Sequence, residues 1–230
     1  MSASVPSRRD RLVELYHEAS DCQRCPLAAT RTKVVFGSGN ADADLMFVGE
    51  APGAEEDRQG LPFVGRAGAL LIELIEGIGM TREDVFIGNV LMCRPPGNRD
   101  PQPDEIEACS PYLHRKVELI QPKVVGTLGN FATKLLTGSP TGITKVRGTP
   151  QVHALGGRAV YIMPLLHPAA ALRTPSLVET LRGDFARFPE LLATPSPQEV
   201  AEARAAGETE MPVAVGAAAG DERDQLDLFR

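Results

Sequence analysis

Residues 44–57 read DLMFVGEAPGAEED, and this stretch decides the fold class. Its apolar part, Asp44–Gly49, has the length of a buried strand. The turn that follows holds two glycines and a proline, which let a ligand approach the backbone closely. Taken alone, the turn fits an ordinary surface loop with solvated acids better. A strand that ends in such a turn is nevertheless typical of α/β proteins, where ligands bind at the carboxyl ends of parallel strands.

Strand and helix patterns alternate along the rest of the chain. We expect helices over residues 8–20, 65–78, 104–120 and about 177–192, and another that ends at Leu136. Further strands are expected over 85–92, 123–128 and 160–166. Four strands joined by helical crossovers predict an α/β fold, a three-layer α/β/α arrangement with a central four-stranded parallel sheet.

The composition is that of a soluble globular protein, with 230 residues, 43% of them hydrophobic, and a net charge of −6. From Glu190 onward the chain has nine acidic and three basic residues, whereas the preceding residues carry 21 of each. The acidic balance therefore does not exclude nucleic acid as a partner. No apolar run approaches the roughly 18 residues of a membrane span. The charged N-terminal segment lacks a secretory pattern, so we expect a cytoplasmic protein without a membrane partner.

The residues after about Thr194 are rich in Ala, Glu, Pro and Gly and contain few large apolar side chains up to Asp221. This composition is typical of a disordered segment. We therefore predict a folded domain over 1–192, a disordered acidic linker over 193–224 and a terminal peptide over 225–230.

Four cysteines are the first chemical signal. Cys22 and Cys25 form a CxxC pair, and Cys93 and Cys109 follow much later. Disulfides are rare in the cytoplasm, and four thiolates suit either zinc or an iron–sulfur cluster. Zinc sites commonly use two close pairs, which weakly favours a cluster here. Four buried free cysteines are the alternative.

Three further side chains stand out by type and place. Asn89 is expected toward the carboxyl end of a strand, where its amide can read the edge of an amide-like base, although a lone Asn is more often a turn former. His167 follows the 160–166 strand and can stabilise an oxyanion or be an ordinary surface residue. Phe63 lies between prolines and glycines, where it is either a core residue or a stacking platform.

Together these segments resemble family 4 of the uracil-DNA glycosylases. The resemblance covers about residues 8–192 and rests on GEAPGAEED at 49–57, GLPFVGRAG at 60–68, NVLMCRPPGNRDP at 89–101, HPAAALR at 167–173 and the four cysteines. It implies an α/β/α fold with a four-stranded parallel sheet. It also implies a 4Fe-4S cluster, with Cys22, Cys25, Cys93 and Cys109 as its ligands.

The resemblance further implies a monofunctional uracil-DNA glycosylase, a hydrolase of N-glycosyl bonds. Such an enzyme flips deoxyuridine out of single- or double-stranded DNA and releases uracil to start base excision repair. By this resemblance Phe63 stacks on uracil, Asn89 reads its O4/N3 edge and His167 stabilises negative charge on O2. The backbone of Gly49, Glu50 and Ala51 completes the uracil pocket, and Leu172 and Arg173 contact DNA.

One departure concerns the attacking water. The best-known branch of the superfamily places an Asp where this chain has Ala51. Glu50, Glu56 and Asn98 are the candidates to position water, and we favour Glu50 as the catalytic one. Another relative traps uracil covalently through a histidine in a basic insert after the second strand. Residues 94–99 of this chain take that place and contain no His, so we do not expect a trapping mechanism. A non-catalytic or slow uracil- or damage-binding module is the alternative, against which both Asn89 and His167 argue.

The chain ends in Gln225-Leu226-Asp227-Leu228-Phe229-Arg230. A chance apolar end, or a final turn docked on the body, is the simpler interpretation. The segment also resembles the short peptide by which bacterial repair proteins bind the sliding clamp. We therefore predict a clamp contact through Gln225, Leu226, Leu228 and Phe229, in a protein that is otherwise a monomer.

Overall fold

The structure is a computed structural model that describes residues 5–205. A six-stranded sheet runs in the order β1-β3-β2-β4-β6-β5. Its four inner strands are parallel, which confirms the predicted centre of an α/β fold. The strand bounds are β1 Ser38–Gly39, β2 Leu45–Gly49, β3 Phe86–Asn89, β4 Val124–Leu128, β5 Gln151–Leu155 and β6 Arg158–Leu165.

Two antiparallel edge strands extend the predicted four-stranded sheet. The strand β1 pairs with β3, and a Cβ on Gly39 would lie 2.0 Å from the carbonyl oxygen of Val85, so only a glycine fits there. The strand β5 pairs with β6 through a tight hairpin. Its turn residues, Gly156 and Gly157, both have positive φ, as two-residue hairpin turns of this type require.

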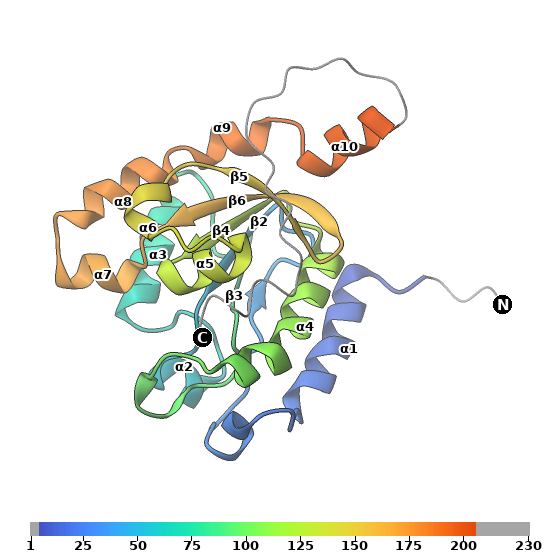
Figure 1. Cartoon of the computed structure of the whole chain (residues 1–230), viewed down its shortest axis with the longest axis vertical. Helices are drawn as coiled ribbons and strands as arrows, with labels where there is room; N and C mark the ends of the chain where they lie inside the picture. Colours follow the sequence, from blue (N-terminus) through green and yellow to red (C-terminus); the bar gives the residue numbers. More distant parts are fainter. Residues whose placement is uncertain (1–4, 206–230) are drawn as a thin grey trace.

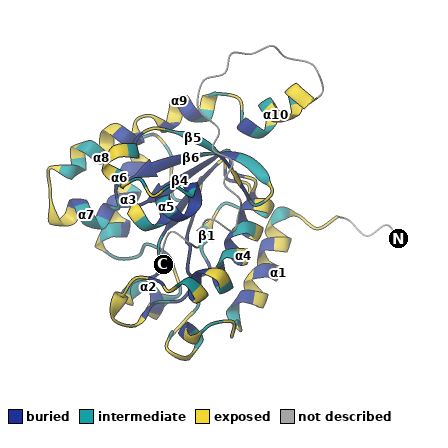
Figure 2. Cartoon of the chain, in the orientation of Figure 1, coloured by how far each residue is buried: buried dark blue, intermediate teal, exposed yellow. Residues whose placement is uncertain are grey.

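Helices cover both faces of the sheet, as expected for three layers (Figure 1). One face packs against α1 Arg8–Ser20, α4 Pro103–Ile120 and α5 Asn130–Thr137. The other packs against α3 Arg66–Glu76, α8 Leu177–Phe185 and α9 Phe188–Ala193. Buried residues are concentrated in the strands between these layers (Figure 2). The shorter elements are η1 Pro26–Ala29, α2 Ala54–Gln59, η2 Pro96–Asn98, α6 Ile143–Val146, α7 Pro168–Arg173 and α10 Pro197–Ala205.

Two expectations about the C-terminal part need correction. The helix expected over 177–192 is divided into α8 and α9, and Pro189, in the first turn of α9, has no backbone N–H to continue a helix. The segment from 193 is not wholly irregular, because 197–205 form α10. That helix packs on β6, where Gln198 Oε1 accepts a hydrogen bond from the Ala159 backbone N at 2.9 Å. The rest of the linker and the 225–230 peptide lie outside the described residues.

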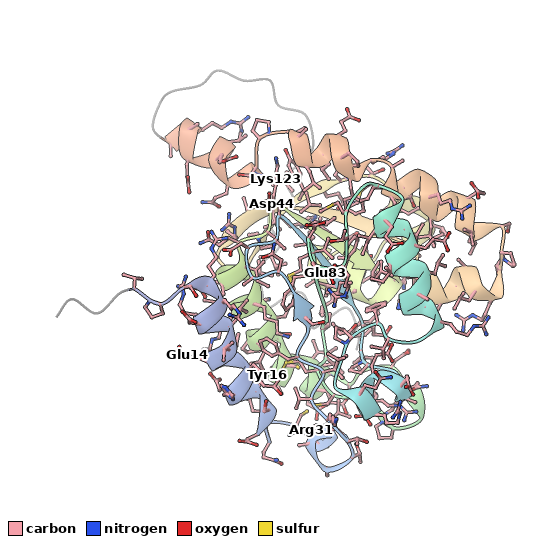
Figure 3. The ribbon with its side chains drawn as sticks, turned by 180° about the vertical axis from the view of Figure 1, so that it is seen from behind. Glu14, Tyr16, Arg31, Asp44, Glu83 and Lys123 are labelled. Carbon is pink, nitrogen blue, oxygen red and sulfur yellow. The ribbon has the colours of Figure 1, made fainter. Side chains whose placement is uncertain are left out.

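The two ends of the parallel strands have different roles. Asp44 and Lys123 lie together at the amino ends of β2 and β4 (Figure 3), and the Lys123 backbone N donates to the Asp44 carbonyl at 2.9 Å. The carboxyl ends lie opposite, and Arg31 lies toward that end of the molecule in the same view. Among residues 5–205, no helix is both long and apolar enough to cross a membrane.

Candidate functional site

A cavity of about 420 Å³ opens where β2, β3 and β6 end. It brings together most of the site residues predicted from the sequence, although these lie on five separate segments. Neither Gly49 nor Leu172 is part of its lining, and Leu172 is instead an exposed apolar side chain on α7. The lining residues are Glu50, Ala51, Pro52, Gly53, Glu56, Phe63, Ala67, Asn89, Pro95, Asn98, Arg99, His167, Ala169 and Arg173.

The floor of the cavity is Asn89, which lines it, with Gly49 beside it in the sheet. They are paired at the last positions of β2 and β3. A Cβ on Gly49 would lie 2.4 Å from Asn89 Oδ1 and 3.0 Å from Phe63 Cζ. The Asn89 side chain is buried, with 3% of the residue exposed. The glycine therefore gives the amide and the aromatic ring room to face one space.

Phe63 forms one wall in an unusual backbone conformation. Its φ is +54°, in the left-handed region that side chains such as Phe rarely adopt. Gly68 on α3 makes this possible, because a Cβ there would lie 1.7 Å from the Phe63 carbonyl oxygen. The Phe63 ring is partly buried and stacks near the His167 ring, with centroids 5.8 Å apart and planes at 26°. The ring therefore packs against the core and also lines the cavity.

His167 caps the first turn of α7 with its own side chain. Nδ1 accepts a hydrogen bond from the Ala169 backbone N at 3.1 Å, so in the neutral ring the proton is on Nε2. Burial, together with the charge of Arg173, lowers the pKa of His167 to about 4. At neutral pH the imidazole is therefore uncharged, and its Nε2–H remains to donate. Gly129, at the end of β4, allows this close packing, since its Cβ would be 3.2 Å from that of His167.

The candidate water-positioning groups differ in their surroundings. Burial, and then the charge of Asp100, raises the pKa of Glu50. Glu56 lies against Gly53, where a Cβ would be 2.6 Å from its Oε2. Asn98 Oδ1 already accepts a hydrogen bond from Arg94 Nε at 2.7 Å.

Arg99 is a cavity residue that the sequence analysis did not single out. Its guanidinium makes two bonds to Glu105, Nη1 to Oε2 at 2.9 Å and Nη2 to Oε1 at 2.5 Å. Glu105 is 1% exposed and also accepts from the Gln102 backbone N at 2.8 Å. The capping-box spacing of Gln102 and Glu105 was the available signal, but it does not reveal the arginine.

The four cysteines line a second, much smaller cavity, between the end of α1, η1 and α4. Cys109 Sγ accepts a hydrogen bond from the Met92 backbone N at 3.4 Å, and Cys93 Sγ accepts one from Arg31 Nη1 at 3.6 Å. Burial raises the pKa of the Cys109 thiol to about 11. Within residues 5–205, no three His, Cys, Asp or Glu side chains are arranged around a single metal ion.

Comparison with known proteins identifies the family of this chain. The profile of the Uracil DNA glycosylase superfamily matches residues 36–200. A type-4 uracil-DNA glycosylase from Sulfurisphaera tokodaii is 47% identical, and the match covers 81% of this chain and 87% of that protein. The values are 44%, 81% and 96% for one from Archaeoglobus fulgidus, and 48%, 73% and 87% for one from Thermotoga maritima. This chain therefore belongs to the uracil DNA glycosylase superfamily, and within it to the type-4 uracil-DNA glycosylases.

Proposed function

We propose that this chain is a monofunctional uracil-DNA glycosylase that flips deoxyuridine out of DNA and hydrolyses its N-glycosidic bond. The observation that carries the proposal is the neutral His167, whose Nε2–H is left to donate beside the ring of Phe63. Such a donor, fixed in advance, stabilises charge that develops on a leaving group. No lysine is among the described residues that line this cavity, so we expect no strand cleavage through an amine.

The base would enter between Phe63 and the floor, where Gly49 lies beside Asn89. The Asn89 amide accepts from uracil N3–H and donates to O4, and cytosine presents the reverse pattern. Because Asn89 is buried, a mismatched base would leave its polar atoms unpaired, which is costly. The backbone of Glu50 and Ala51 completes the pocket.

Hydrolysis then requires one water. Its oxygen bonds to C1′ as the N1–C1′ bond breaks, and the bonding pair leaves with uracil. The negative charge spreads to O2, where His167 donates from Nε2. Glu50 is our choice to take the water proton, since its raised pKa suits a general base better than an unperturbed carboxylate does. Glu56 and Asn98 remain supporting candidates in the wall.

Contacts with DNA are assigned to α7. Leu172 is 37% exposed beside the cavity, which suits a side chain that fills the gap left by the flipped base. Arg173 lines the cavity, and its proposed role is to contact the DNA backbone. The proposed substrates are uracil-containing single and double strands.

The cysteine cavity is proposed to hold a 4Fe-4S cluster. The donor set fits, because four thiols from distant segments surround one small space. In such a cluster each cysteine binds a different iron, so the sulfurs need not converge on one point. When bound, the cluster would cross-link these segments and could exchange an electron. Cys22, Cys25, Cys93 and Cys109 would hold it in the reducing cytoplasm, which we propose as the location of a monomeric enzyme.

The terminal peptide is proposed to bind the sliding clamp through Gln225, Leu226, Leu228 and Phe229. Support comes from the sequence alone, since these residues lie outside 5–205. The last described helix ends at Ala205, 20 residues before Gln225. A tethered contact of this kind would raise the local concentration of the enzyme on newly made DNA.

The experiment that separates these functions is uracil release from a single-stranded oligonucleotide, measured alongside binding. An enzyme releases free uracil over many turnovers and leaves an abasic strand uncut. Tight binding of the uracil strand with no release would instead support the damage-binding module.

A further inference from the structure

The Arg99–Glu105 pair leaves one edge of the Arg99 guanidinium unused. The two bonds to Glu105 involve the end of the guanidinium, between Nη1 and Nη2. The second Nη1–H donates to the Asp100 carbonyl at 2.9 Å. The remaining Nε–H and the outer Nη2–H point the same way, as the covalent geometry of arginine requires, and have no partner among the described residues. Two parallel N–H groups of this kind match two oxygens of a phosphate.

The position of Arg99 also suits a phosphate. Its side chain is 40% exposed, although it lines the cavity that holds the buried Asn89. The segment that carries Arg99 follows β3, whereas the α7 helix that carries Arg173 follows β6. In the sheet β2 and β4 separate these strands, so the two arginines reach the one cavity from segments that follow different strands.

We propose that Arg99 binds a phosphate next to the flipped nucleotide, and that Glu105 positions it. This inference rests on the proposed function. A base that enters the cavity brings its flanking phosphates to the rim of the cavity, which Arg99 lines with a side chain 40% exposed. Arg173 has no acidic partner in the described part of the chain. Of the two arginines, Arg99 is therefore the one whose side chain is held in place before DNA binds.

The arrangement explains why a buried carboxylate stands at the start of α4. Glu105 is held by the Arg99 fork and by the Gln102 backbone N, so its charge is compensated. A guanidinium held in this way loses little side-chain freedom on binding DNA. Glu105 thus acts through Arg99, as a positioning residue.

The test is the salt dependence of half-saturation in single-turnover uracil release from a single-stranded oligonucleotide. Arg99→Gln should raise the half-saturating concentration about 10- to 100-fold. It should also lower the slope of log affinity against log salt by about 0.7, the value for one phosphate contact on a single strand. Glu105→Gln should raise half-saturation but keep the wild-type slope. In the Arg99→Gln background it should not raise half-saturation further, since Glu105 acts on DNA binding through Arg99.

Controls separate this role from a structural one. Arg115→Gln breaks another Arg–Glu pair of α4, to Glu18 on α1, and should leave both the slope and half-saturation unchanged. The double variant Arg99→Gln/Glu105→Gln removes both charges together, so it leaves no uncompensated buried charge if either single variant unfolds. Inhibition by free uracil, which has no phosphate, should be the same in all variants.

A wild-type salt slope for Arg99→Gln would overturn the inference, and so would a wild-type slope for the double variant where the single variant unfolds. Weaker inhibition of Arg99→Gln by free uracil would also overturn it. So would a further loss when Glu105→Gln is added to Arg99→Gln. If the wild-type chain releases no uracil, the proposed function fails. The same salt titration, read as binding of a His167→Ala variant and its Arg99→Gln derivative to the oligonucleotide, would still decide whether Arg99 contacts a phosphate.

Discussion

The ring centroids of Phe63 and His167 lie 5.8 Å apart, with only 26° between the ring planes. The two residues come from loops more than a hundred positions apart, and each is held by its own backbone. Phe63 keeps a positive φ above Gly68, and His167 caps α7. The spacing between a fixed aromatic face and a fixed hydrogen-bond donor is the feature from which the proposed chemistry follows.

Gly49→Ala should slow uracil release about 100-fold without unfolding the protein. The new Cβ would meet only side-chain atoms, Asn89 Oδ1 at 2.4 Å and Phe63 Cζ at 3.0 Å, so these groups shift rather than the backbone. A displacement of this size at a reacting centre costs about that factor. Gly183→Ala on α8 is the control, because nothing lies within 4 Å of its added Cβ. A wild-type rate for Gly49→Ala would show that the floor of the pocket is misassigned.

The stability of the protein should depend on pH through His167. Its pKa is about 4 in the folded chain and 6.5 as a reference value. Below about pH 6.5 the unfolded chain takes up a proton that the folded chain does not. The contribution of the neutral ring to the free energy of unfolding is therefore complete above pH 6.5 and is lost as the pH falls toward 4. The difference in melting temperature between wild type and His167→Asn should change across this interval and be flat above it. A difference that is constant from pH 4 to 7 would contradict the buried neutral ring.

The protein purified under conditions that preserve iron should be brown, with four irons per chain. Cys93→Ala should lose the colour and also stability, because the proposed cluster would cross-link Cys93 and Cys109 across 15 residues. A cross-link that closes such a loop is worth about 3 kcal/mol. This corresponds to a fall in melting temperature of about 6–12 °C for a chain of this size. A colourless protein with one zinc per chain would refute the cluster.

The full chain should bind purified sliding clamp, and the Leu228→Ala/Phe229→Ala variant should not. Apolar anchors of this kind supply most of the affinity of a short peptide. Both forms should release uracil equally from a free oligonucleotide, since the changes lie outside the catalytic domain. Equal binding by both forms, or binding by neither, would remove the clamp contact and leave the catalytic assignment untouched.

The fold was largely predictable because the four inner strands are short apolar runs bounded by helical patterns. The edge strand β1 was not, since two residues carry no periodicity. The strand β5 escaped for a different reason. Gly156 and Gly157 form a hairpin turn that the sequence signals, but Gln151–Leu155 is only partly buried and alternates weakly.

The residue types of the site were predictable from sequence, but their relations were not. Motifs placed Asn89 and His167 at strand ends, and the structure brings both into one cavity. The protonation state of His167 depends on the Ala169 N–H and on burial, which no motif encodes. The orientation of Arg99 depends on its bond to Glu105, whose position in the sequence indicates only a helix start. The helix α10 was missed because its composition is that of a polar linker.

The most direct test of the central claim is the single-turnover rate of uracil release by the wild type and by His167→Ala on the same single-stranded oligonucleotide. Loss of one preorganised donor to O2 should slow release about 10²–10³-fold. Binding of the uracil strand should be nearly unchanged. His17→Ala, on the exposed face of α1, should release uracil at the wild-type rate. Equal rates for His167→Ala and wild type would contradict the assignment of His167 as the donor that drives the departure of uracil.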